Sequence, residues 1–301
     1  MRLMKVFRMI AASMLSAALC LGFTACSDDD ENENGGDGGS VATVVNPSKV
    51  FEGGVPKSAA GMSISQNEEG LVTSITTEDG KAVFEYFFAN TKADVAKNQA
   101  RITVTDAEGD VTVLNLQLNS DGYVEFCNSI DHAGTPDADK FTWEMEYDAE
   151  GRLIVMKRSE SDGEITNITY NKDGDVVKTS TRYVGGGDIN GDGVVDSNDE
   201  WEYSAIIDYT TDKITTPIEN KGCLMLFDET LDVDMDEMIY AYYGGMLGKA
   251  TKHLPLVQRY TYDNAGSVGV LNFEWTLNSD GYPTELVTKD QWDEDKYTFT
   301  W

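Results

Sequence analysis

The chain has few of the side chains on which metal and nucleophile chemistry depends. Of its 301 residues only two are histidine and four are cysteine. No two cysteines have Cys-x-x-Cys spacing, so we expect neither a zinc site nor Cys–His catalysis. The sequence also lacks a Gly-x-Ser-x-Gly elbow, a phosphate-binding loop and a His-Glu-x-x-His motif. It therefore contains none of these catalytic motifs.

Basic residues are also scarce. The chain has 23 Lys and Arg against 53 Asp and Glu, which gives a formal net charge of −30. Such a surface repels phosphate backbones, so we expect no nucleic-acid partner. A solvated acidic face is the simplest interpretation, and a site for divalent cations is the alternative.

Long apolar runs are confined to the N-terminus. Arg2, Lys5 and Arg8 precede the mostly apolar run Met9–Leu21, which is too short to span a membrane as a helix. Small residues then lead to Cys26. This order predicts a lipoprotein signal peptide at residues 1–25 that is removed, with lipid attached to Cys26.

The residues after Cys26 are acidic and polar. The run Ser27–Glu31 resembles the surface-export signal of lipoproteins from Bacteroidota-type Gram-negative bacteria. That resemblance implies a lipid-anchored protein on the outer face of the outer membrane. Residues 26–40 contain almost nothing apolar and are predicted to form a flexible tether. Residues 41–301 are long enough for one large domain, and no linker divides them.

Two cysteines remain once Cys20 leaves with the leader and Cys26 carries lipid. Cys127 and Cys223 would lie in an extracellular setting, where one disulfide is a candidate. Sequence alone does not place them within bridging distance, so two free thiols stay open as the alternative.

Strand and turn signals alternate along most of the domain. Phe141–Tyr147 has apolar residues at the odd positions and polar ones at the even positions, the pattern of a strand with one buried face. Leu118–Tyr123 returns letter for letter as Leu277–Tyr282, and Tyr147–Leu153 and Tyr170–Asp175 are related. Each places a glycine in a polar turn. The spacing is irregular, so we predict an all-β antiparallel meander and not a solenoid.

One segment favours a helix. Acidic residues lead into Met238–Tyr243, and Gly244 and Gly245 follow. Acidic side chains in a first turn match the helix dipole, so we predict a helix over 234–243 that packs on the sheet or plugs it. A ligand groove at this place is the alternative.

The segments Thr216–Gly222 and Tyr243–Pro255, with the Tyr-Asp-x-x-Gly and Ser-Asp-Gly-Tyr turns, carry a family resemblance. From Val41 to Trp301 the chain resembles uncharacterised lipoproteins grouped as a domain of unknown function with a porin-like fold. The resemblance implies an all-β fold with one or two short helices: a single large antiparallel meander that forms a strongly curved sheet or closed barrel. It implies no activity. Because polar strand faces carry Glu144 and Glu146, where a lipid-facing band would be apolar, we expect a soluble barrel or bent sheet.

One motif has the oxygen spacing of a calcium loop, and it resembles half of a dockerin module. Its expected ligands are Asp188, Asn190, Asp192, Val194 through its carbonyl, Asp196 and Asp199, with Gly193 at the sharp bend.

The alternative interpretation of this segment is an acidic hairpin loop that binds no ion. No second loop accompanies the first, and Asp199 is shorter than the usual bidentate glutamate. The flanking residues read as strands, with a short helix from Asn198 to Asp208 as the alternative. We expect calcium to stiffen the loop and not to take part in catalysis.

Three functions remain. The first is a non-enzymatic surface protein that binds a ligand or glycan or serves adhesion. The aromatic residues that could stack on sugars are Tyr123, Trp201, Tyr282 and Trp292. The second is an envelope-assembly partner with an exposed apolar patch at Tyr240–Leu247. The third is a glycoside hydrolase that uses a carboxylate pair, such as Glu144 with Glu146 or Asp293 with Asp295.

Overall fold

The structure is a computed structural model, and it describes residues 45–87, 99–160, 163–183, 201–261 and 268–301. By its internal contacts the chain divides into residues 1–40 and 41–301. All described residues belong to the second unit.

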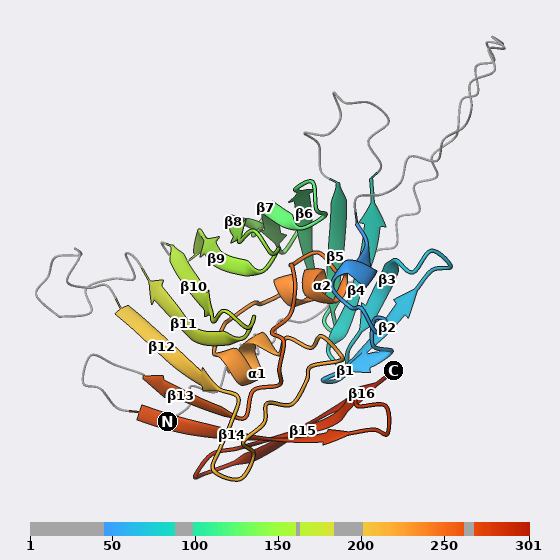
Figure 1. The fold of residues 1–301 in the computed structure, drawn as a ribbon. Helices are drawn as coiled ribbons and strands as arrows, with labels where there is room; N and C mark the ends of the chain where they lie inside the picture. Colours follow the sequence, from blue (N-terminus) through green and yellow to red (C-terminus); the bar gives the residue numbers. More distant parts are fainter. Residues whose placement is uncertain (1–44, 88–98, 161–162, 184–200, 262–267) are drawn as a thin grey trace, which may run out of the picture. The chain divides into compact units, whose positions relative to one another are not determined.

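Sixteen antiparallel strands form a closed barrel in which every strand pairs with its neighbours in sequence (Figure 1). The barrel closes where Ser58 of β1 pairs with Thr300 of β16. The fold is therefore all-β, and of the two predicted sheet forms it is the closed one. The strands are β1 (Ser58–Ala59), β2 (Met62–Gln66), β3 (Val72–Thr76), β4 (Gly80–Tyr86), β5 (Ala100–Asp106), β6 (Val111–Leu118), β7 (Val124–Asp131), β8 (Asp139–Tyr147), β9 (Leu153–Arg158), β10 (Glu164–Tyr170), β11 (Val176–Tyr183), β12 (Trp201–Asp208), β13 (Val257–Thr261), β14 (Val268–Leu277), β15 (Pro283–Lys289) and β16 (Glu294–Thr300).

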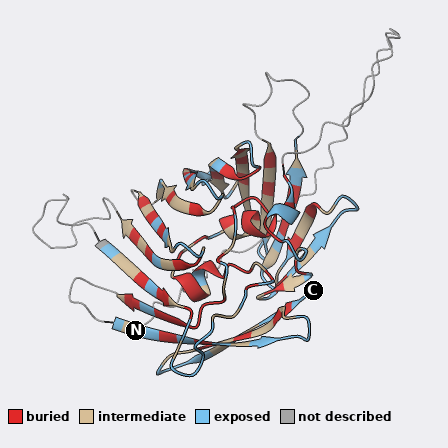
Figure 2. Cartoon of the chain, viewed as in Figure 1, coloured by how far each residue is buried: buried red, intermediate tan, exposed pale blue. Residues whose placement is uncertain are grey.

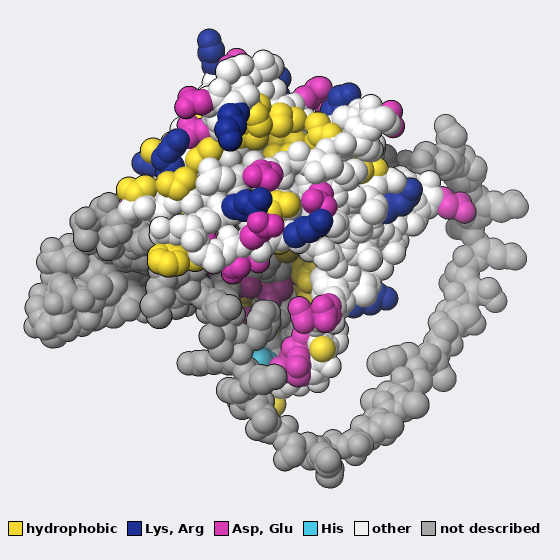
Figure 3. Space-filling view, turned by 90° about the horizontal axis from the view of Figure 1, so that it is seen from below, with side chains coloured by type: hydrophobic (Ala, Val, Ile, Leu, Met, Phe, Trp, Pro, Cys, Tyr) yellow, Lys and Arg dark blue, Asp and Glu magenta, His cyan; other side chains and the backbone are white. Residues whose placement is uncertain are grey.

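The wall follows the alternation that the sequence predicts. On β8, Phe141, Trp143 and Met145 are buried while Glu144 and Glu146 are exposed. The exposed glutamates pair with Lys157 on the outer face of β9. Figure 3 views the side on which β14–β16 lie, and acidic and basic side chains stand beside one another there with hydrophobic ones among them.

Five hairpins share one turn, with a shift in strand pairing beside it, that explains the repeated sequence formula. The Asp106–Asp110 turn makes the same two hydrogen bonds without that shift. In each of the five turns, the Oδ1 atom of an Asn or Asp accepts hydrogen bonds from the backbone N–H groups two and four residues later. A glycine with positive φ follows, and the pairing shifts by one residue beside the turn. The five turns are Asn67–Leu71, Asn119–Tyr123, Asp148–Arg152, Asn171–Asp175 and Asn278–Tyr282.

All five turns lie at the same end of the barrel, because each joins an even-numbered strand to the next odd-numbered one. We call it the turn end. The connection from β12 to β13 also begins and ends there. This connection, residues 209–256, is the plug. It runs inside the ring of strands and contains α1 (Phe227–Leu231) and α2 (Met238–Tyr243) (Figure 1).

The plug forms the centre of the hydrophobic core. Tyr242 and Tyr243 are fully buried, and Phe227 packs edge-on against Tyr242. The N-terminal segment, which includes the 3-10 helix η1 (Pro47–Lys49), also contributes, because the Phe51 ring stacks near Tyr243 at 6.2 Å. In Figure 2 the buried colour covers the helices of the plug and much of the inner side of the wall, whereas residues 212–216 at the start of the plug are exposed. The barrel interior is therefore filled by the chain itself.

Three details differ from the sequence-based expectations. The helix predicted over 234–243 begins only at Met238, because Asp236 takes a positive φ of 45° and interrupts the helical backbone before it. The alternative helix over 198–208 is wrong, since Trp201–Asp208 is strand β12. The segment Tyr240–Leu247 is not an exposed patch, because Ala241 to Leu247 are buried inside the barrel.

Candidate functional site

Two of the turns, and the strand residue next to a third, bind the plug through the backbone. The N–H of Val124 donates to the carbonyl of Met246 at 2.8 Å, next to the turn that ends at Tyr123. The N–H of Lys249 donates to Gly151 at 2.9 Å, and that of Lys252 donates to Gly174 at 3.1 Å. The repeated turns are therefore docking points for the plug as well as chain reversals.

A buried polar cluster fixes the last part of the plug. The carboxylate of Asp175 accepts a hydrogen bond from the backbone N–H of His253 at 2.9 Å and contacts the His253 ring nitrogen Nδ1 at 2.9 Å. The Tyr209 hydroxyl lies 2.9 Å from the hydroxyl of Thr251, and burial raises the pKa of Tyr209 well above its ordinary value. These contacts join the wall to the plug and hold its backbone in place.

Asn220 organises the first part of the plug in the same way. Its side-chain amide donates to the carbonyls of Leu224 and Thr251 at 2.8 and 3.0 Å, and its Oδ1 accepts from the Leu224 N–H at 3.0 Å. The Tyr242 hydroxyl donates to the carbonyl of Cys223. The two arms of the plug, one before α1 and one after α2, are thus held side by side.

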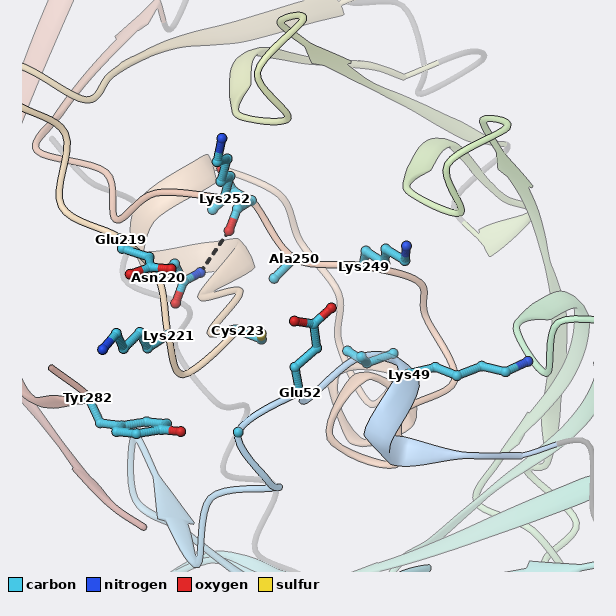
Figure 4. Close-up of a pocket in the computed structure, with 13 residues that line it drawn as sticks. Lys49, Glu52, Glu219, Asn220, Lys221, Cys223, Lys249, Ala250, Lys252 and Tyr282 are labelled. Atoms are coloured by element: carbon cyan, nitrogen blue, oxygen red, sulfur yellow. Dashed lines mark hydrogen bonds between the residues drawn. The ribbon is translucent and has the colours of Figure 1, made fainter. Parts of the chain in front are cut away.

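A pocket opens between these two arms, the N-terminal segment and the turn at Tyr282 (Figure 4). Its volume is about 420 Å³, within the range of small-molecule sites. The lining residues are Lys49, Val50, Glu52, Gly53, Glu219, Asn220, Lys221, Cys223, Lys249, Ala250, Thr251, Lys252 and Tyr282.

Tyr282 lines one side of the pocket and packs against Trp301 behind it. The Tyr282 ring lies 4.9 Å from the Trp301 ring, centroid to centroid, and the Trp301 Nε1 donates to the carbonyl of Pro283 at 2.7 Å. Two glycines make room for these rings. A Cβ atom on Gly53 would lie 2.3 Å from the Tyr282 hydroxyl oxygen, and one on Gly222 would lie 2.3 Å from the Trp301 ring. The packing of the Tyr282 and Trp301 rings therefore requires glycine at positions 53 and 222.

Four lysines and two glutamates supply the charge of the pocket. The lysines are Lys49, Lys221, Lys249 and Lys252, and the glutamates are Glu52 and Glu219, so the lining carries 4 − 2 = +2. In Figure 4 the Glu52 carboxylate points into the space between the arms, and the lysines lie around its edge. A chain with a net charge of −30 thus places a basic pocket at its turn end.

A second charged cluster lies inside the barrel, away from this pocket. The Arg158 guanidinium stacks over the Trp143 ring at 4.8 Å and donates to Asp236 at 2.6 Å. Burial raises the pKa of the neighbouring Glu237 to about 7, and the charges of Asp236 and Asp131 act in the same direction. The start of α2 therefore places the Glu237 carboxyl group in a poorly solvated space, beside the exposed Asp236.

The residues predicted for lipidation, calcium binding and a disulfide have different outcomes in the structure. Cys26 and the predicted calcium loop at 188–199 lie outside the described residues. Cys127 and Cys223 are free thiols, so the candidate disulfide is not formed. The reason is their placement, since Cys127 is buried on β7 and Cys223 lines the pocket at the turn end. Burial raises the pKa of both thiols, that of Cys127 to about 12.

The candidate sugar-binding aromatics have different surroundings. Tyr282 lines the pocket, whereas Tyr123 is buried and packs on Tyr147. Trp292 is 83% exposed in the β15–β16 connection, at the end opposite the turn end. The side chain of Trp201 is outside the described part.

The candidate carboxylate pairs do not face one another across a cleft. Glu144 and Glu146 lie on the outer wall beside Lys157. Asp293 lies in the exposed β15–β16 connection, where its Oδ1 accepts the N–H of Glu294. Neither pair has the opposed geometry of a glycosidase.

Sequence reasoning missed the pocket and its lysines. Two signals were available. The resemblance segments at 216–222 and 243–255 contain Lys221, Lys249 and Lys252, and the repeated turn at 278–282 contributes Tyr282. What the sequence does not give is that the two segments lie side by side inside the barrel.

No helix among the described residues is long and apolar enough to cross a membrane. No group of three or more His, Cys, Asp or Glu in the described ranges is arranged to hold a metal ion.

Comparison with known proteins gives a family and a fold. The sequence profile of a family described as a domain of unknown function (DUF4595) with porin-like fold matches residues 64–285. No curated protein matches the sequence.

Among solved structures, a porin-like protein from Bacteroides uniformis is 19% identical with a TM-score of 0.52, and the match covers 79% of this chain and 88% of that one. A porin-like protein from Bacteroides vulgatus is 11% identical with a TM-score of 0.54, with 79% and 91% covered. These likenesses concern the fold. With the family match over most of its barrel, this chain belongs to the domain-of-unknown-function family with a porin-like fold.

Proposed function

We propose that this chain is a non-enzymatic, lipid-anchored protein of the outer cell surface that binds a saccharide in the pocket at the turn end. The observation that carries the proposal is the pocket of about 420 Å³ with an aromatic face at Tyr282 and polar side chains around it. Aromatic faces that pack against sugar rings, together with a few placed polar groups, are typical of such sites.

The filled interior favours binding over passage of solutes. The plug buries Phe227, Tyr242 and Tyr243 in the centre of the barrel. An open pore has a polar, water-filled lumen, and a plugged one does not let solute through without rearrangement. The porin-like wall therefore serves as a rigid support for the plug.

Hydrolysis is the weaker alternative. Glu52 and Glu219 both line the pocket, but both are exposed to solvent. The acid of a glycosidase is held in a desolvated place beside the scissile bond. The pocket supplies carboxylates that can accept hydrogen bonds from sugar hydroxyls, and no buried acid.

Saccharide binding is tested with the full chain purified in a non-ionic detergent. The first step is a glycan array, followed by calorimetric titration with the best ligand. We expect Tyr282→Ala to weaken binding by about tenfold, because the ring face is lost. Trp292→Ala is the matched control, since that exposed aromatic lies at the other end of the barrel, and it should leave affinity unchanged. The proposal would be contradicted if the protein bound no glycan on the array, or if Tyr282→Ala and the parent protein had equal affinity.

The anchor is proposed from the leader and the acidic run after Cys26. Mass spectrometry of the native protein should find an acylated N-terminal cysteine, and protease added to intact cells should remove the barrel. An unacylated N-terminus or a protected barrel would contradict this part of the proposal.

Calcium binding at Asp188, Asp192 and their neighbours is a separate proposal that rests on oxygen spacing. The described strands β11 and β12 pair from Lys178↔Ile206 to Tyr183↔Trp201, so the motif lies in the connection between two adjacent strands. Calorimetric titration with calcium should give heat that Asp188→Ala/Asp192→Ala abolishes. Identical heats from the parent protein and the variant would contradict calcium binding at this motif.

A further inference from the structure

We propose that the saccharide bound in the turn-end pocket is negatively charged, and that Lys249 and Lys252 hold its carboxylate or sulfate group. The inference rests on the proposed saccharide binding and adds the class of ligand. It follows from how the lysines are placed, what they already bind, and which charges surround the pocket.

The pocket lysines differ from those of the wall in their partners. On the wall, Lys157, Lys289 and Lys296 pair with glutamates on neighbouring strands. Among the described residues, none of the four pocket lysines forms a salt bridge to a carboxylate. Their positive charge is thus not neutralised by a direct partner, and an anionic group can be that partner.

Two of the four lysines are held in place by turn carbonyls. The Nζ of Lys49 donates to the carbonyl of Asp121 at 3.0 Å, and that of Lys221 donates to the carbonyl of Asp280 at 3.0 Å. An ammonium group has three N–H donors, so each keeps two for other partners. The turns therefore fix two positive charges at the pocket edge before any ligand arrives.

Lys249 and Lys252 are held through their backbone and leave their ammonium groups for a ligand. Their N–H groups donate to the carbonyls of Gly151 and Gly174, which anchors both residues to wall turns. Their side chains are exposed at the pocket. In Figure 4 Lys249 and Lys252 lie on the side of the pocket away from Tyr282, and the Lys252 ammonium group points away from the Glu52 carboxylate. Both side chains are exposed, so they can turn toward a bound anion, with the body of the sugar between them and the Tyr282 ring.

Carboxylates on the turns around the pocket favour a small anion over an extended anionic surface. Asp121, Glu150, Asp173 and Asp280 lie at the exposed tips of four turns at this end. An extended anionic surface, such as a membrane, would approach these four carboxylates as well as the lysines. Charges within about 8 Å act on one another at physiological salt, so this ring repels an anionic membrane. A small ligand whose charge enters the centre avoids the repulsion.

The test uses the full chain in detergent and matched trisaccharides. The probes are trigalacturonate, a sulfated trisaccharide and neutral maltotriose, titrated by calorimetry. We expect at least one anionic probe to bind about tenfold or more tightly than the neutral one, because charged hydrogen bonds to lysine add to the ring contact. Binding of that probe should weaken as salt rises from about 50 mM to about 300 mM.

Variants separate the pocket from the general surface charge. Lys249→Ala/Lys252→Ala should lower affinity for the anionic probe by about tenfold or more and leave maltotriose unaffected. Lys249→Arg/Lys252→Arg should restore most of it. Lys289→Ala/Lys296→Ala removes the same charge from the wall and should change nothing.

The outcomes distinguish this inference from the saccharide proposal. If maltotriose binds as tightly as both anionic probes, or if the two double alanine variants behave alike, the anionic ligand is wrong while saccharide binding stands. If no saccharide of either class binds, the proposed function fails as well. Binding of inorganic sulfate with the same affinity as the sulfated sugar would show an anion site without saccharide recognition.

Discussion

The wall and the plug of this barrel are ordered in different ways. Each wall strand pairs with its sequence neighbours and alternates buried and exposed side chains, as Phe141 to Glu146 show. The plug has two short helices and no strand, yet it contains fully buried residues such as Tyr242 and Tyr243. Local pattern therefore specifies the wall, whereas the plug takes its shape from the interior it fills and from the turns that bind it. Substitutions should reveal this difference.

The largest expected effect is in the plug core. Tyr243→Ala removes a fully buried ring that stacks near Phe51, and should lower the free energy of unfolding by about 3–5 kcal/mol in urea denaturation. Tyr243→Phe is the matched control. The Tyr243 hydroxyl has no hydrogen-bond partner among the described residues, so its removal should cost nothing or stabilise the protein. Equal losses for both variants would mean that the hydroxyl is bonded and the ring is not the main contribution.

The next effect concerns the pH dependence of the plug. Burial raises the pKa of Glu237 to about 7 from 4.5, so the folded state binds a proton that the unfolded state releases over this range. Stability from this group is full below about pH 4.5 and is lost as pH rises through about 7, with an upper limit of about 3 kcal/mol. We expect Glu237→Gln to unfold at higher urea than the parent at pH 8 and at similar urea at pH 4.5. A difference that does not change with pH would contradict the assigned pKa.

A smaller effect separates turns that touch other side chains from turns that do not. Gly151 and Gly109 both have positive φ, but a Cβ atom on Gly151 would lie 3.0 Å from the Tyr123 ring, while Gly109 faces open space. Alanine at either position should cost about 1–2 kcal/mol for the backbone. Gly151→Ala should cost more than Gly109→Ala in the same urea experiment. The opposite order would show that the turn end does not constrain the wall.

The smallest effect is expected on the outer wall. Val268 on β14 is 60% exposed, and Val268→Ala should change the free energy of unfolding by no more than about 0.5 kcal/mol. Val72→Ala, at a fully buried position on β3, is the matched comparison and should cost clearly more. Similar costs at both positions would mean that a further partner covers the Val268 face.

What the sequence predicts follows the same division. The alternation in Phe141–Tyr147 predicts β8, and the repeated turn formula predicts hairpins that the structure confirms. Closure of the sheet depends on β1 and β16, two strands at opposite ends of the domain, which no local pattern connects.

The site is largely beyond local reasoning. Tyr282 was predicted as a sugar-stacking aromatic and does line the pocket, but Tyr123 has the same sequence context and is buried. The two tyrosines differ because Tyr282 meets Gly53 and Trp301, residues from the two ends of the domain. The positions of Lys249 and Lys252 depend on the hydrogen bonds between the plug and the wall turns, which no local sequence pattern predicts.

The central claim is that the plug is a folded part of the barrel and carries the binding pocket. Hydrogen exchange of the full chain tests it most directly, read at the backbone amides of Asn220, Lys249 and Lys252, each of which donates a hydrogen bond within the plug or to a turn. We expect these amides to exchange about as slowly as those in the centre of β6 and β7. Rapid exchange of the plug amides beside a protected wall would show an unfilled barrel and would contradict it.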